Sequence, residues 1–146
     1  MAGYSGTPLA KKLGIKPESL VALLGAPSDF ERQLTGLPDG VRFTTRAAGT
    51  PELVIWFATS RRHLDGRAAD VARLVVAGRA GRTGGGLWIA WPKKASGVAT
   101  DLTEDVVRRA GLAHGLVDYK VCAIDTTWSG LKFARRSSPQ RLSTSR

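Results

Sequence analysis

The clearest pattern along the chain is a set of short runs that are apolar at every position. Three such runs cover Leu20–Leu24, Leu53–Ala58 and Leu87–Trp91. A strand with one face in water alternates apolar and polar residues, whereas a strand covered on both faces is apolar throughout, as in parallel sheets. The three runs therefore predict adjacent parallel strands at the centre of one sheet.

Helical patterns alternate with these runs. Apolar residues recur at helical spacing from about Ser60 to Ala77, which predicts one buried helix face. A second helix is predicted over Glu104–Ala113, with Asp101 or Thr103 as its N-cap. Strands that alternate with helices are typical of an α/β fold.

Two shorter helices are predicted near the N-terminus. The segment Thr7–Gly14 has Thr7 in the N-cap position, a proline next and a glycine at its end, which is a common arrangement of helix termini. The segment Asp29–Thr35 follows Ser28, and Ser28 and Glu31 stand at capping-box spacing.

The remaining strands complete the expected sheet. A short strand is predicted over Val41–Thr45, and only residues 46–52 separate it from the run at Leu53. That link is too short for a crossover helix, so one strand–helix unit is shortened or absent. The segments Leu116–Ile124 and Trp128–Arg135 are separated by three residues and predict an antiparallel hairpin.

Size and composition predict one globular domain of cytoplasmic type. The chain has 146 residues, of which 42% are apolar, enough for one core. We expect the domain to span residues 1–136 and residues 137–146 to form a disordered basic tail. No run approaches the roughly 18 apolar residues of a membrane span, and no secretion signal is evident. The single cysteine, Cys122, fits a reducing compartment and is expected to be a buried, inert thiol.

The chain is strongly basic, with 22 Lys and Arg residues against 12 Asp and Glu residues. Four of the arginines lie in the last twelve residues, which leaves 18 basic residues in residues 1–134; the four are Arg135, Arg136, Arg141 and Arg146. A basic surface and tail make nucleic acid a possible partner. A solvated basic surface is the simpler interpretation, because the charges are spread along the chain.

Five motifs are spread over nearly the whole chain except its tail. They are YSGTPLAKKLGIK at Tyr4–Lys16, LGAP at Leu24–Pro27, WPKKASGVATDLTE at Trp91–Glu104, Lys120–Asp125 and WSGLKF at Trp128–Phe133. Together they resemble a bacterial family of small proteins that is classified only as a domain of unknown function. The resemblance identifies relatives and implies no activity.

The expected architecture, an α/β sheet that ends in an antiparallel hairpin, resembles a shortened Rossmann-like S-adenosylmethionine methyltransferase. That resemblance would imply a glycine-rich loop after the first strand and an acidic residue at the end of the second. Here the first loop offers Gly25 followed by Ala26 and Pro27, and the second strand ends in Thr45-Arg46. Both cofactor anchors are missing, so no cofactor is expected.

Ligands of open α/β sheets bind beyond the carboxyl ends of the strands. The long loop after Trp91 carries two lysines, two hydroxyls and a glycine before a helix start, which favours an anion. Trp128 lies beside the hairpin turn, whereas Trp56, Trp88 and Trp91 are expected in the core. The candidate ligand-binding residues are Gly25, Pro27, Ser28, Lys93, Lys94, Ser96, Gly97, Thr100 and Trp128.

No residue pattern points to catalysis or to a metal. His63 and His114 stand alone on helices, and the acidic residues at 101–105 are explained by helix capping. Asp125, at the hairpin turn, is expected to bond its own backbone. The sequence therefore favours a non-catalytic domain that binds an anionic small molecule or a protein partner. A methyltransferase and a nucleic-acid-binding protein remain the alternatives.

Overall fold

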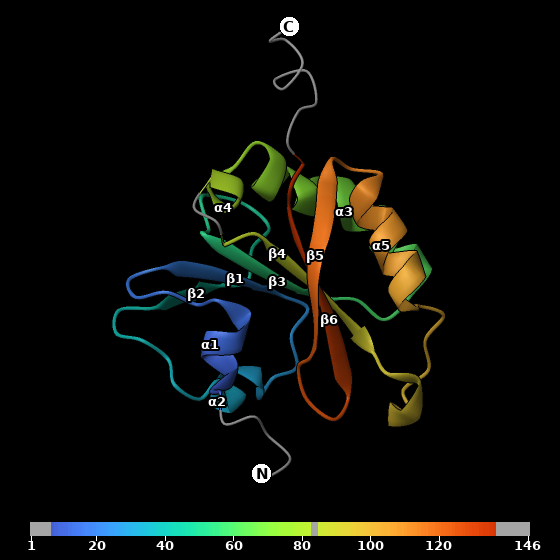
Figure 1. Cartoon of the computed structure of the whole chain (residues 1–146), viewed down its shortest axis with the longest axis horizontal. Helices are drawn as coiled ribbons and strands as arrows, with labels where there is room; N and C mark the ends of the chain where they lie inside the picture. Colours follow the sequence, from blue (N-terminus) through green and yellow to red (C-terminus); the bar gives the residue numbers. More distant parts are fainter. Residues whose placement is uncertain (1–6, 83–84, 137–146) are drawn as a thin grey trace, which may run out of the picture.

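The structure is a computed structural model that describes residues 7–82 and 85–136. It holds one six-stranded sheet with helices on both faces (Figure 1). In chain order the elements are α1 (Leu9–Leu13), β1 (Leu20–Leu24), α2 (Phe30–Gln33), β2 (Arg42–Thr44), β3 (Leu53–Phe57), α3 (Arg61–Val76), α4 (Arg79–Arg82), β4 (Leu87–Pro92), the 3-10 turn η1 (Lys94–Ser96), α5 (Glu104–Leu112), β5 (Leu116–Ala123) and β6 (Trp128–Arg135).

The strand order is β2-β1-β3-β4-β6-β5. The first four strands are parallel, and β6 runs antiparallel to both of its neighbours. The three apolar runs are thus adjacent parallel strands, and the C-terminal segments form the hairpin, as the sequence predicts.

The order of strands reverses beside β1. From β1 the chain passes outward to β2 and then returns past β1 to β3, on its other side. The return uses residues 45–52 and contains no helix, which confirms that one strand–helix unit is absent. A reversal of this kind is the topological switch point of an open α/β sheet, where such sheets place their ligands.

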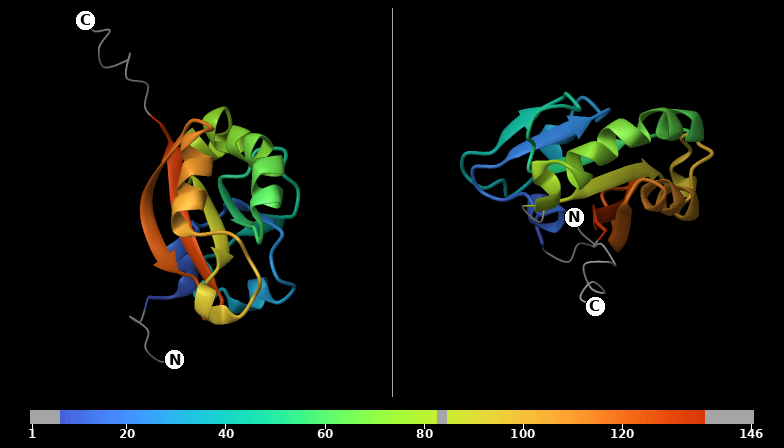
Figure 2. Two further views of the ribbon diagram at one scale, coloured as in Figure 1. Left: turned by 90° about the vertical axis from the view of Figure 1, so that its right-hand side faces the viewer. Right: turned by 90° about the horizontal axis from the view of Figure 1, so that it is seen from above.

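Two helical layers cover the sheet (Figure 2). One hydrophobic cluster joins α3, α4 and α5 to one face and includes Trp56 and Trp91. The other joins α1 and α2 to the opposite face and includes Trp88 and Phe30. All three tryptophans of the apolar runs are buried, because strands in the middle of the sheet have a helix layer on each side.

Two of the predicted helix starts are wrong. The N-cap of α1 is Pro8 and not Thr7, since the Pro8 carbonyl accepts the N–H groups of both Lys11 and Lys12 at 3.0 Å. Likewise α2 begins at Phe30 with no side-chain cap, so the capping box of Ser28 and Glu31 does not form. Phe30 is fully buried, and its packing decides where this short helix lies.

The longer helices begin where the sequence indicates. The Ser60 hydroxyl accepts the N–H of His63 at 3.1 Å, and the Thr103 hydroxyl accepts the N–H of Val106 at 3.2 Å. These are N-cap bonds. No helix in residues 7–82 and 85–136 has the length and apolar character needed to cross a bilayer.

The hairpin turn follows aspartate turn chemistry. Oδ1 of Asp125 accepts the N–H groups of Thr127 and Trp128, each at 2.8 Å. This confirms that Asp125 bonds its own backbone.

Packing of α5 on the sheet predicts the effect of one glycine substitution. Gly111 lies directly against the buried ring of Phe133, and an added Cβ would overlap that ring. Gly111→Ala should therefore lower the free energy of unfolding by about 1–3 kcal/mol, the usual cost of overpacking a core. Urea unfolding followed by circular dichroism measures it.

Gly66→Ala is the matched control, because a Cβ at this exposed position on α3 meets nothing within 4 Å. It should raise the free energy of unfolding by about 0.5–1 kcal/mol through helix propensity. Equal effects of the two substitutions would contradict the packing described for α5.

Candidate functional site

The ends of β1 and β3 meet closely at the switch point. Gly25, which follows β1, is exposed and has a left-handed backbone with φ of +69°. A Cβ on Gly25 would lie 2.9 Å from the carbonyl oxygen of Phe57 at the end of β3. Glycine is thus required both for the turn and for the close approach. The half-buried Pro27 and the exposed Ser28 continue this turn.

The loop after β4 is held in one shape by its own side chains. The Ser96 hydroxyl donates to the carbonyl of Lys93 at 2.7 Å and accepts the N–H of Val98 at 3.1 Å. Gly97 then ends η1 with φ of +82°. The Ser96 hydroxyl, predicted as a ligand contact, is therefore already bonded within the loop.

Two further bonds tie this loop to the start of α3. The Thr100 hydroxyl donates to the carbonyl of Thr59 at 2.6 Å, and Oδ1 of Asp101 accepts the N–H of Arg61 at 2.8 Å. Asp101 therefore caps α3, which follows β3, and Thr103 alone caps α5 by a side-chain bond. The loops after two neighbouring parallel strands are thus connected at the edge of the sheet where the parallel strands have their carboxyl ends. We call this the carboxyl edge.

This edge presents cations. Lys94, Arg61 and Arg62 are exposed and Lys93 is half-buried. Across the described ranges, none of these four has a carboxylate within 4 Å. The Asp101 carboxylate beside them accepts a backbone N–H. Arg61 and Arg62, which the sequence did not indicate, thus lie at the same edge of the sheet as Lys93 and Lys94.

Trp128 lies beside the same edge, on the α1–α2 face of the sheet. Its ring is half-buried and packs edge-on against Phe57, with ring centroids 4.9 Å apart. Phe57 also packs edge-on against Phe30, at 4.8 Å. These three aromatic rings fill the space next to the end of β3. The role of Trp128 as a ligand contact stays a prediction.

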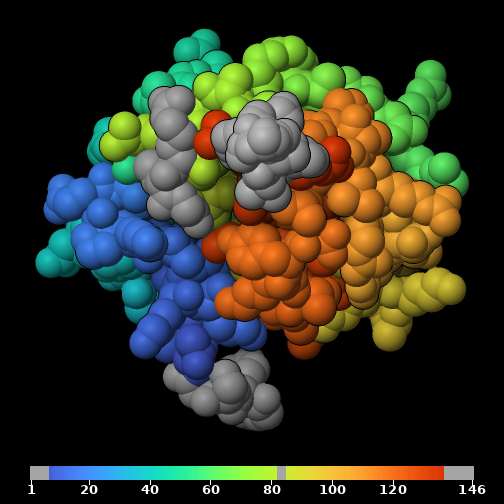
Figure 3. All heavy atoms as spheres, turned by 45° about the horizontal axis from the view of Figure 1, so that its top comes forward, coloured from blue at the N-terminus to red at the C-terminus, as the bar shows by residue number. Residues whose placement is uncertain are grey.

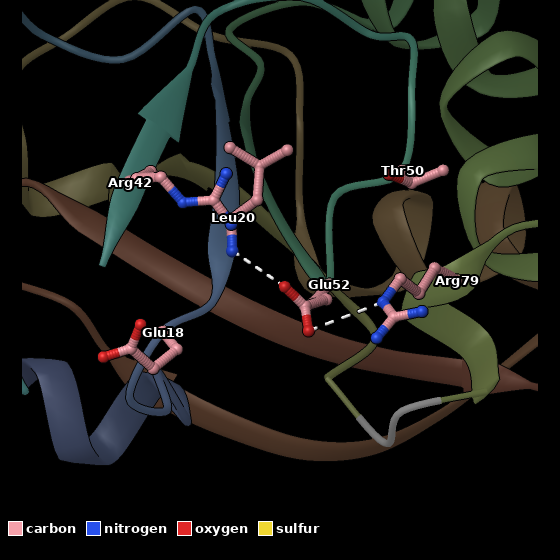
Figure 4. A pocket seen from close by; sticks show the side chains of 6 residues that line it. All are labelled: Glu18, Leu20, Arg42, Thr50, Glu52 and Arg79. Atoms are coloured by element: carbon pink, nitrogen blue, oxygen red, sulfur yellow. Dashed lines mark hydrogen bonds and ion pairs between the residues drawn. The ribbon is translucent and has the colours of Figure 1, made fainter. Parts of the chain in front are cut away.

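A cavity lies at the opposite, amino-terminal edge of the parallel strands (Figure 4). It has a volume of about 330 Å³. Its lining residues are Glu18, Leu20, Arg42, Thr50, Glu52 and Arg79. Sequence reasoning missed this group because its members come from four separate segments, and the acidic residue before an apolar run is the one signal that could have indicated it.

The centre of this cavity is Glu52. Its carboxylate accepts the N–H of Leu20 at 2.9 Å and forms an ion pair with Arg79 at 3.5 Å. The bond from the Leu20 backbone, aided by the positive charges of Arg79 and Arg42, lowers the pKa of Glu52 below its ordinary value of 4.5. Glu52 thus joins the start of β1 to α4, which is a structural function.

The remaining titratable residues of interest are dispersed. His63 is exposed, with its ring 6.0 Å from that of Trp56, and Nδ1 of His114 lies 3.0 Å from the carbonyl oxygen of Ala110. Cys122 is half-buried on β5, and burial raises the pKa of its thiol. In the part of the chain that is described, no three His, Cys, Asp or Glu residues are grouped to hold a metal.

No family model matches this chain. No curated protein matches it either. A structure of LepI in complex with SAM matches with a TM-score of 0.49 and 13% sequence identity, over 88% of this chain and 39% of that chain. This chain therefore spans well under half the length of that protein.

Glu52 is expected to make the free energy of unfolding depend on pH in the acidic range. Because its folded-state pKa is lowered, the ionised carboxylate stabilises the fold above pH 4.5, and this stabilisation is lost as the pH falls through the folded-state pKa. Glu52→Gln should lower the free energy of unfolding by under about 1 kcal/mol at pH 7, since Arg79 is exposed and Glu52 only half-buried. The difference between parent and variant should vanish in acid. Urea unfolding between neutral and acidic pH measures it, and a difference that grows on acidification would contradict the proposed bond.

Substitution of Thr100 tests how much its hydrogen bonds stabilise the loop at the carboxyl edge. Thr100→Val keeps the shape of the side chain but removes the bonds to the Thr59 carbonyl and from the Leu102 N–H. The free energy of unfolding should fall by roughly 1 kcal/mol, and amide exchange at Leu102 should accelerate. Thr126→Val, at an exposed position without a hydrogen bond to any described residue, is the control and should change neither quantity.

Proposed function

We propose that this chain is a non-catalytic α/β binding domain that holds an anionic group at the carboxyl edge of its sheet. The ligand would lie between the turn at Gly25 and the loop that bears Lys93 and Lys94. The observation that carries the proposal is the fixed loop whose neighbouring cations have no carboxylate partner among the described residues.

Rigidity of this loop supports the proposal. A loop that is ordered before binding loses little conformational entropy when a ligand arrives. The bonds of Ser96, Thr100 and Asp101 order this loop. Lysine ammonium groups bind phosphate or carboxylate as point charges, so the ligand would be an anionic small molecule or an acidic segment of a protein partner.

The non-catalytic part of the proposal rests on the absence of cofactor anchors in the sequence. Gly25 is followed by Ala26 and Pro27, and no acidic residue follows β2 at Thr45-Arg46. An S-adenosylmethionine-dependent methyltransferase is the alternative. We also propose, from the motifs given above, that the chain is related to the bacterial family of small proteins of unknown function.

The lysine pair provides the direct test. Replacing both Lys93 and Lys94 with alanine should change the free energy of unfolding by less than about 0.5 kcal/mol, because surface substitutions seldom cost more. Binding of an anionic probe should weaken by about 1.5–3 kcal/mol for each charge-assisted hydrogen bond lost. Isothermal titration calorimetry with ATP and with citrate as probes measures the affinity.

The double variant Lys11→Ala/Arg67→Ala is the matched control, because it removes the same net charge from exposed positions on other elements. It should bind both probes as the parent does. An unchanged affinity in the Lys93/Lys94 variant would refute the proposed site. Micromolar binding of S-adenosylmethionine would favour the methyltransferase instead, and salt-sensitive binding of an oligonucleotide by the chain without residues 137–146 would favour nucleic acid.

A further inference from the structure

Lys132 is an unusual residue for the inside of a protein. It lies on β6 between Trp88 of β4 and Lys120 of β5, and only 8% of its surface is exposed. Within the described ranges it has no carboxylate within 4 Å, and its ammonium donates no hydrogen bond. Buried lysines are normally paired, because removing an unpaired charge from water is costly.

Two aromatic rings face Lys132 and only partly compensate its charge. Its ammonium lies over the ring of Trp88, 5.5 Å from the ring centre, and over that of Tyr119, at 5.9 Å. These cation–π contacts attract the ammonium but carry no net negative charge. Burial, together with the positive charges of Lys120 and Lys16, lowers the pKa of Lys132 below its ordinary value of 10.5. Cys122 is the one group with the opposite effect, and burial holds its own thiol pKa high.

A fourth lysine completes the cluster. Lys12 on α1 donates to the carbonyl of Ala123 at 3.4 Å, and Lys120 donates to the carbonyl of Lys12 at 3.5 Å. These contacts bring the end of α1 beside the edge strand β5. Figure 3 shows the two segments side by side on the surface. We call Lys12, Lys16, Lys120 and Lys132 the lysine cluster.

The ammonium of Lys132 is not completely enclosed by the protein. Every fully buried side-chain nitrogen or oxygen in the described part of the chain has a hydrogen-bond partner. Because the Lys132 ammonium has none there, it must still touch solvent. Gly14 forms one wall, since a Cβ at this left-handed residue would lie 2.8 Å from Nζ.

We propose that the lysine cluster is a second anion site, distinct from the carboxyl edge, and that it binds a phosphate group with Lys132 beneath it. Lys120 is the cross-strand neighbour of the buried Lys132, Lys12 lies against Lys120, and Lys16 is near enough for its charge to act on Lys132. A phosphate dianion neutralises two of these cations at once, which a single carboxylate does not do. Lysines bind phosphate as point charges. The site would accept free phosphate or the phosphate of a small monoester.

Inorganic phosphate and glycerol phosphate are the probes, added to the full chain and followed by NMR. Phosphate should raise the pKa of Lys132, read from its Cε resonance, because an anion favours the protonated amine. It should also shift the indole N–H resonance of Trp88, which lies beside the ammonium. Tighter binding of glycerol phosphate would identify an organic phosphate as the ligand, and equal binding would identify the phosphate group alone.

Lys132→Met separates binding from folding. It replaces the buried ammonium with an apolar chain of similar length, so the melting temperature should rise while phosphate affinity falls at least about tenfold. Lys16→Ala and Lys120→Ala, both at exposed positions, should each weaken binding several-fold. Lys11→Ala, on the same helix as Lys12, should not.

Two results would overturn this inference: a Lys132 resonance that does not respond to phosphate, or a Lys132→Met variant that binds phosphate as the parent does. The variant without Lys93 and Lys94 should keep the response of Lys132. Loss of phosphate binding in that variant alone would uphold the carboxyl-edge site and reject this one, so the two proposals fail separately.

Discussion

A single buried hydrogen bond joins the N-terminal helix to the middle of the sheet. The indole N–H of Trp88 donates to the carbonyl of Leu13 at 2.8 Å, and Trp88 is fully buried on the central strand β4. A buried indole N–H without a hydrogen-bond partner would lower the free energy of unfolding by about 1–3 kcal/mol. This favours an arrangement in which the end of α1 lies close enough for its carbonyl to accept the bond. Gly14 then turns the chain with a left-handed backbone. The same bond thus holds α1 against the sheet and positions Gly14 beside the ammonium of Lys132.

The two edges of the parallel strands are held by different means. At the amino edge, Glu52 joins β1 to α4 through one backbone bond and one ion pair. At the carboxyl edge, Thr100 and Asp101 join the loop after β4 to the loop after β3. Glu52 at the amino edge is paired with Arg79, whereas Lys93 and Lys94 at the carboxyl edge have no acidic partner among the described residues. Lysines without an acidic partner therefore lie at the edge where α/β sheets bind ligands.

The fold could be predicted from the sequence far better than the candidate sites. Apolar runs such as Leu53–Ala58 report burial on both faces, and the short link before Leu53 reports a missing helix, because both are local signals. The bond from Thr100 to Thr59 joins residues 41 positions apart, and the approach of Lys12 to Ala123 spans 111 positions. No rule of sequence spacing relates residues that are so far apart along the chain. The capping box at Ser28 failed for a related reason, since burial of Phe30 outweighed a local preference.

The sequence gives the net charge of the chain, but only the structure shows where the charged side chains lie. All five ion pairs among the described residues use arginine, and no lysine takes part in one. The four arginines of these pairs thus join elements or lie along helices, whereas six of the seven lysines lie at the carboxyl edge or beside β5 without an ion-pair partner among the described residues. Like charges held together destabilise the folded state. An anion bound at either proposed site would reduce that repulsion. If it bound only the folded chain, it would stabilise the fold, and at concentrations above its dissociation constant the gain would rise with the logarithm of its concentration.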